Sequence, residues 1–201
     1  MICLRLFISR DEYILRELKM CSKTRIHTDS KTDIETKRKI CSIYAPILTE
    51  LINSIPEGTH HNHGAVLVTK NSQKLVRCLN HSRKPFAGFP NKMVATHAEI
   101  GVVKRMTKYY TRIARGRSRK MTEVDLIVIR INRTRELKDS KPCFHCISML
   151  ANLKDFGYRL NNIYYSTSDG DIYCEKFTAL YNSPVKHISA GWRLVHHHNL
   201  K

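Results

Sequence analysis

Acidic residues are scarce in this sequence. Its 201 residues include 17 Asp and Glu against 35 Lys and Arg, which gives a formal net charge of +18. Such an excess attracts polyanions, among them nucleic acids, nucleotides and anionic membrane surfaces. The charge alone leaves open whether such a partner exists, because basic surface residues can also serve solubility.

Long apolar runs are also missing. The apolar stretch over residues 1–9 is short and interrupted by Arg5, and Asp11 and Glu12 follow it. A membrane-spanning helix needs about 20 apolar residues, and a secretory signal peptide has an uninterrupted apolar centre. We therefore expect no membrane segment and a soluble intracellular protein, which we place in the cytoplasm while leaving the nucleus open.

A disulfide framework is not indicated either. The seven cysteines are odd in number and unevenly spaced, at positions 3, 21, 41, 78, 143, 146 and 174. Thiols stay reduced in the cytosol, where two cysteines close together in sequence point to metal binding or catalysis. A chain of this length can bury a sufficient core without disulfides.

What is present favours one globular domain with an arm. Hydrophobic residues make up 42% of the chain, too many for a disordered protein. We expect residues 1–33 to form a basic N-terminal arm, residues 34–195 the folded domain and residues 196–201 a short tail.

Helical spacing of apolar residues predicts helices over residues 34–55, 96–115 and 143–156, and weakly over 185–195. Pro46 should kink the first helix or mark its true start.

Strands are expected between these helices. Residues 64–69 and 75–79 predict a hairpin, residues 124–131 a buried central strand, residues 162–167 another buried strand and residues 172–177 an edge strand. Residues 81–92 are expected to form a polar loop that contains Pro85, Gly88 and Pro90. The alternation of helices and strands predicts an α/β fold, a three-layer α/β/α sandwich around a mixed sheet.

Two short motifs carry the chemistry. One is His97-Ala98-Glu99 and the other is Pro142-Cys143-Phe144-His145-Cys146, and each begins a predicted helix. Cysteines three residues apart share one face of a helix, so Cys143 and Cys146 can take two corners of a zinc tetrahedron, with His97 as the third ligand. The fourth position is then left for water, and the carboxylate of Glu99 is available to move protons.

These two motifs, in this order, resemble the signature of the cytidine deaminase superfamily, from about residue 64 to residue 167. The resemblance implies a mixed sheet of about five strands flanked by helices, with Zn²⁺ held between two helix starts by His97, Cys143 and Cys146. It also implies that Asn80, at the end of the second predicted strand, contacts a substrate sugar. Members of this family are often dimers or tetramers, so the resemblance is compatible with a homo-oligomer.

The segment between the motifs is long and basic. It holds 43 residues, and from Lys104 to Lys120 it contains eight cationic residues and no acidic one. A helical stripe could therefore bind phosphates of RNA, single-stranded DNA or a nucleotide, or it could be the solvated side of an amphipathic helix. The stripe consists of Lys104, Lys108, Arg112 and Arg115. Phe86 and Phe89, just before His97, are candidates to line the base pocket, or they pack against their own core.

The resemblance implies hydrolytic deamination, in which zinc-activated hydroxide attacks the amine-bearing ring carbon and Glu99 acts as the proton shuttle. Cytosine and adenine share this chemistry. We expect the cytosine of a nucleoside or nucleotide, of the cytidine or deoxycytidylate type, because enzymes for small substrates are common in the family. The alternatives are a deaminase of polynucleotides (RNA, tRNA adenosine or single-stranded DNA), a zinc-containing nucleic-acid-binding protein without catalysis, and a closed zinc site with Cys78, Cys174 or His145 as fourth ligand.

Overall fold

The computed structural model describes residues 44–56, 62–69, 71, 74–79, 81–86, 89–113 and 121–189, of which residues 62, 81–86, 89–95 and 108–113 are described by their backbone only. The expected arm (residues 1–33) and tail (residues 196–201) therefore lie outside the described residues. So do Asn80, Arg115 and the first part of the helix expected over residues 34–55.

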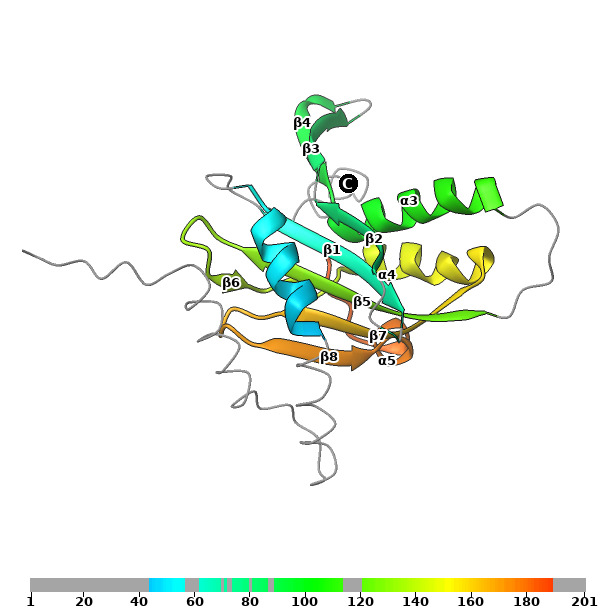
Figure 1. Cartoon of the computed structure of the whole chain (residues 1–201). Coiled ribbons are helices and arrows are strands. Elements are labelled where there is room, and N and C mark those ends of the chain that lie inside the picture. The colour runs from blue at the N-terminus through cyan, green and yellow to red at the C-terminus, as the bar shows by residue number, and fades with distance from the viewer. Residues whose placement is uncertain are drawn as a thin grey trace, which may run out of the picture.

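A mixed sheet forms the centre of the fold, as predicted (Figure 1). Its strands are β1 (Asn62–Thr69), β2 (Lys74–Leu79), β5 (Thr122–Ile131), β6 (Leu137–Lys138), β7 (Tyr158–Ser166) and β8 (Ile172–Lys176). The order across the sheet is β2-β1-β5-β7-β8, with the short β6 paired to β5. The pair β5 and β7 is parallel, whereas the other pairs are antiparallel.

Helices cover both faces of this sheet. On one face lies the helix of residues 44–54, whose Leu51 packs with Val66 of β1 and Ile129 of β5. On the other face lie α3 (Ala98–Ile113), α4 (Phe144–Ala151), the short 3₁₀ helix η2 (Asn152–Phe156) and α5 (Phe177–Asn182). Successive side chains of β1 point to opposite faces of the sheet, so this strand contributes to the hydrophobic core on each face. Ala65 and Leu67 face α3, while Val66 and Val68 face the first helix. The three layers of the prediction are present.

The central strand, β5, matches the buried strand that the sequence predicted over residues 124–131. Residues 124–131 of β5 are all buried or nearly buried, as their apolar and β-branched composition predicts. The predicted hairpin of residues 64–69 and 75–79 is present as β1 and β2, and the predicted edge strand is β8.

The predicted polar loop over residues 81–92 was wrong. This segment belongs to a second, two-stranded sheet formed by β3 (His81–Phe86) and β4 (Phe89–Thr96). The prolines and Gly88 suggested a loop. However, both strands of an isolated hairpin are edge strands, and an edge strand tolerates proline because its N–H side can remain unpaired.

Two further predictions near the C-terminus need correction. The strand expected to reach Phe177 stops at Lys176, and the helix α5 begins there; six residues are too few for helical periodicity to be recognised. Residues 185–189 of the helix expected over 185–195 are not helical. They have no regular secondary structure, and the carbonyl of His187 accepts a 2.7 Å hydrogen bond from the N–H of Phe144, at the start of α4.

No helix in the described ranges has the length and apolar character needed to cross a membrane.

Candidate metal centre

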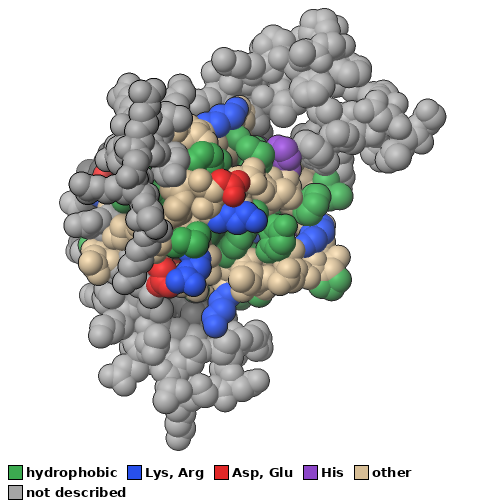
Figure 2. Space-filling view, turned by 90° about the vertical axis from the view of Figure 1, so that its right-hand side faces the viewer, with side chains coloured by type: hydrophobic (Ala, Val, Ile, Leu, Met, Phe, Trp, Pro, Cys, Tyr) green, Lys and Arg blue, Asp and Glu red, His purple; other side chains and the backbone are tan. Residues whose placement is uncertain are grey.

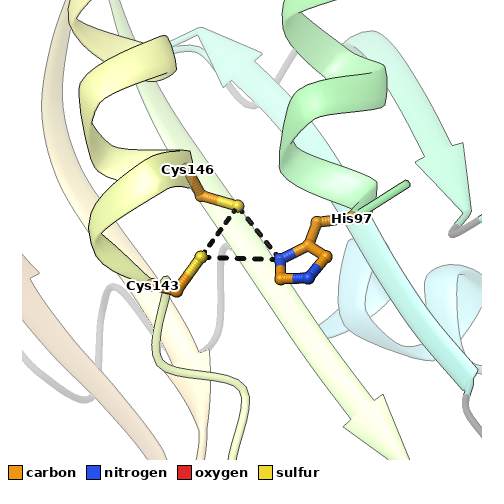
Figure 3. A group of neighbouring side chains, drawn as sticks. All are labelled: His97, Cys143 and Cys146. Carbon is orange, nitrogen blue, oxygen red and sulfur yellow. Dashed lines mark hydrogen bonds between the residues drawn. The ribbon is translucent and has the colours of Figure 1, made fainter. Parts of the chain in front are cut away.

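Three predicted ligands, from segments 46 residues or more apart, meet at one point in the fold (Figure 3). The Nδ1 atom of His97 lies 3.2 Å from Sγ of Cys146 and 3.6 Å from Sγ of Cys143, and the two sulfurs are 3.5 Å apart. The donor atoms all lie within 4.8 Å of one another. Two sulfurs and one imidazole nitrogen in such a group can hold a metal ion.

Two helix starts place these ligands. His97 follows directly on β4, and its carbonyl accepts the first helical hydrogen bond of α3, from the N–H of Gly101 at 3.1 Å. Cys143 is the extended N-cap residue of α4, with φ −75° and ψ 163°, and Cys146 lies in the first turn. The spacing of three residues brings both sulfurs to the same side of α4, as the sequence predicted.

A buried pair of serines holds the segment that leads to Cys143. Ser140 donates from Oγ to the carbonyl of Val128 at 2.9 Å, and its N–H donates to the carbonyl of Ser166, also at 2.9 Å. Ser166 donates from N–H to Oγ of Ser140 at 2.8 Å. These bonds tie residue 140 to β5 and to the last residue of β7. Sequence reasoning missed this pair, and the only available signal was a serine within the apolar run of β7.

A glycine lets α3 lie close to β2. An added Cβ at Gly101 would lie only 2.2 Å from Sγ of Cys78 and 3.2 Å from its Cβ. With a side chain at this position, either the sulfur of Cys78 or the first turn of α3, which carries Glu99, would have to shift. The role of Gly101 was also missed, because one glycine within a helical pattern carries no sign of what faces it.

The metal-ligand group contains no fourth protein ligand within the ranges that the structure describes. Cys78, Cys174 and His145 are all described, and none of them belongs to the group. A group of three ligands is compatible with a bound metal ion that keeps one open coordination position, which is a feature of catalytic metal centres.

A buried carboxylate lies next to this group. Glu99 is only 3% exposed, and its Oε2 atom has no hydrogen-bond partner among the described residues. Burial raises the pKa of Glu99, and the neighbouring imidazole of His97 opposes this rise. A buried carboxylate oxygen without a partner is costly, so its presence at this point needs a functional reason.

The three ligands shift one another's pKa values through the contacts that they share. Hydrogen bonding to Cys146, together with that to His97, lowers the pKa of Cys143 to about 3. The bond that the two thiols share, together with burial, raises the pKa of Cys146. The hydrogen bond with Cys143 also raises the pKa of His97. Metal ligands must be deprotonated, so binding of a divalent cation to this group would release protons.

The remaining predicted site residues are only partly described. Lys104 is exposed on α3, while Lys108 and Arg112 are placed on α3 by their backbone alone. Phe86 and Phe89 are register partners at the end of the β3–β4 hairpin. The structure does not bring a described side chain of this set into contact with the metal-ligand group.

The sequence matches no protein-family model, and no curated protein matches it at a significant level. Inference about function therefore depends on the residues of the site and on their geometry.

Proposed function

We propose that this protein is a zinc-dependent hydrolytic deaminase of a nucleobase. The observation that carries the proposal is the buried carboxylate of Glu99, whose Oε2 atom has no hydrogen-bond partner among the described residues, beside a group of two cysteines and one histidine. A closed structural site would need a fourth protein ligand, and Glu99 is not a member of the metal-ligand group. The pairing of such ligands with a non-ligand glutamate supports the resemblance to the cytidine deaminase superfamily.

The donor set fits zinc. His97, Cys143 and Cys146 would hold the ion, and two thiolates with one imidazole are a common zinc ligand combination. When bound, zinc supplies Lewis-acid activation of a water molecule at its open position. The low pKa of Cys143 favours the thiolate that a zinc ligand must be, and the serine-anchored segment before it fixes where that thiolate lies.

Glu99 would move the protons. Its pKa is raised by burial, so its carboxylate accepts a proton more readily than an exposed one would, and the carboxyl group so formed can later give that proton up. The amine that leaves the base needs such a proton to depart as ammonia. Because the Oε2 atom of Glu99 is bonded to no described group, it is free to make these bonds with water and substrate.

For the substrate, we propose first the cytosine of a nucleoside or nucleotide, of the cytidine or deoxycytidylate type. The alternative is a polynucleotide, either RNA, tRNA adenosine or single-stranded DNA. One observation favours this alternative, namely the concentration of basic residues in the segment that contains His97: residues 81–113 contain seven Lys and Arg and one acidic residue, Glu99.

The test measures zinc content and ammonia release with cytosine, adenine and guanine compounds as substrates. We expect Glu99→Gln to retain zinc and to lose activity by about 10²- to 10⁴-fold, the typical contribution of a general acid–base group. Glu136→Gln is the matched control, because this carboxylate is exposed. Wild-type activity in Glu99→Gln would disprove the proposed role of Glu99.

A second measurement tests the ligand set. Wild-type protein should contain about one zinc per chain, and Cys143→Ala or Cys146→Ala should lose most of it. Cys174→Ala, which alters a cysteine outside the group, should bind zinc normally. Full zinc retention in all three variants would mean that the metal lies elsewhere.

A further inference from the structure

The β3–β4 hairpin stands apart from the rest of the fold. It projects from the sheet, and its strands contact each other but make few contacts with any other element (Figure 1). A two-stranded hairpin alone is at best marginally stable in water. This one leads directly into His97, so its base adjoins the metal-ligand group, while residues 86 and 89 lie at its far end.

Basic residues are concentrated on this hairpin and on the helix that follows it. Residues 81–113 contain seven Lys and Arg against the single Glu99, which is buried. In contrast, residues 121–189 contain nine Lys and Arg against eight Asp and Glu. On the face shown in Figure 2, described acidic and basic side chains lie beside one another. The uncompensated charge of the described chain is therefore concentrated in the hairpin and α3.

Two aromatic residues lie at the end of the hairpin. Phe86 and Phe89 are cross-strand partners around a two-residue connection, so they lie on the same face. Arg83, Lys84 and Lys92 lie in the same two strands, and residues 81–96 contain no acidic residue. Aromatic residues for stacking of bases, with cations for phosphates, are the combination that binds single-stranded nucleic acid.

We infer that the β3–β4 hairpin and the exposed basic residues of α3, Lys104 and Arg105, form a binding surface for a single-stranded polynucleotide. The inference rests on the proposed function, because it extends the substrate of that same site from a nucleotide to a polymer. An unpaired strand is required, since a buried carboxylate can reach only a base that has left the stack.

The binding test uses the full chain and fluorescein-labelled 20-mers of thymidylate or uridylate, followed by fluorescence anisotropy at several salt concentrations. Thymine and uracil carry no exocyclic amine, so binding is measured without any deamination. The hairpin variant Arg83→Gln/Lys84→Gln/Lys92→Gln should bind about 100-fold more weakly at 0.1 M salt, and its log–log salt slope should be smaller by about 2. The matched control removes three exposed charges elsewhere, as Arg133→Gln/Arg159→Gln/Lys176→Gln, and should bind as the wild type does.

A second variant separates stacking from charge. Phe86→Ala/Phe89→Ala should weaken binding by about fivefold or more for each ring lost, without changing the salt slope. Circular dichroism verifies that each variant retains its fold. Equal weakening by the hairpin and control variants would overturn the inference, as would equal affinity for duplex DNA or stronger binding to phosphatidylserine vesicles than to the oligomers.

The outcomes also separate this inference from the proposed function. If binding depends on the hairpin but no substrate is deaminated, the proposed binding surface is supported and the proposed deaminase activity is refuted. If free cytidine or deoxycytidylate is deaminated but the oligomers do not bind, the proposed deaminase activity is supported and the proposed binding surface is refuted.

Discussion

Gly101→Ala tests how closely α3 must approach the sheet for the site to form. The new Cβ would lie 2.2 Å from Sγ of Cys78, whereas carbon atoms in ordinary contact are about 3.5–4.0 Å apart. Cys78 is 1% exposed, so its sulfur has little room to move. Overpacking of this kind costs about 1–3 kcal/mol, while replacing glycine by alanine within a helix gains about 1 kcal/mol. We expect a net loss of up to about 2 kcal/mol in the free energy of unfolding.

Removal of the Cys78 sulfur should reverse the effect of Gly101→Ala on the free energy of unfolding. In a Cys78→Ala background the nearest remaining atom is the Cβ of residue 78, at 3.2 Å, so most of the clash is gone. Gly101→Ala should then stabilise by up to about 1 kcal/mol, the helix propensity gain alone. The coupling energy of the double-mutant cycle should therefore be about 1–3 kcal/mol.

Urea unfolding of the four proteins measures this cycle, provided that the m-value is unchanged. The single variant should also bind zinc more weakly, because Gly101 donates to the carbonyl of His97, and the double variant should recover that binding. Gly157→Ala is the matched control. Gly157 has φ +78° with no atom near its Cβ position, so its cost should be the same with or without Cys78. Additivity of Gly101→Ala and Cys78→Ala within about 0.5 kcal/mol would refute the close-approach argument.

Three further predictions follow from burial and hydrogen bonding. The pKa of Glu99 is raised above its ordinary 4.5 in the folded state, so folding is favoured below that pH and loses stability as the pH rises through the folded value. Glu99→Gln should therefore raise the melting temperature of the chelator-treated protein at pH 8 and leave it unchanged at pH 4. An equal rise at both pH values would contradict the link between ionisation of Glu99 and stability. Ser140→Ala should cost about 1–3 kcal/mol and speed zinc loss to a chelator, whereas Ser148→Ala on α4 should do neither. Tyr44→Phe removes a buried 2.9 Å hydrogen bond to Asp125 and should lower the unfolding free energy by about 1–2 kcal/mol in urea, and no change would show that this bond does not hold the first helix to the sheet.

The local patterns of the sequence determined much of the fold. The largely apolar, β-branched run of residues 124–131 predicted a buried strand, and it is the centre of the sheet. The spacing of Cys143 and Cys146 determined that both sulfurs share one side of a helix. These features depend on the periods of helix and strand, which act over a few residues and can be read directly from the chain.

Only the tertiary structure decided how distant segments meet. It placed His97 against the two cysteines, tied Ser140 to Ser166 and packed Gly101 onto Cys78. It also formed the β3–β4 hairpin from a segment that composition marks as a loop. Contacts of this kind depend on the register of strands and on the packing of helices across a sheet, and no period within a single segment carries that information. The sequence therefore named the residues of the candidate site, but packing of the whole domain decided that their donor atoms lie within 4.8 Å of one another.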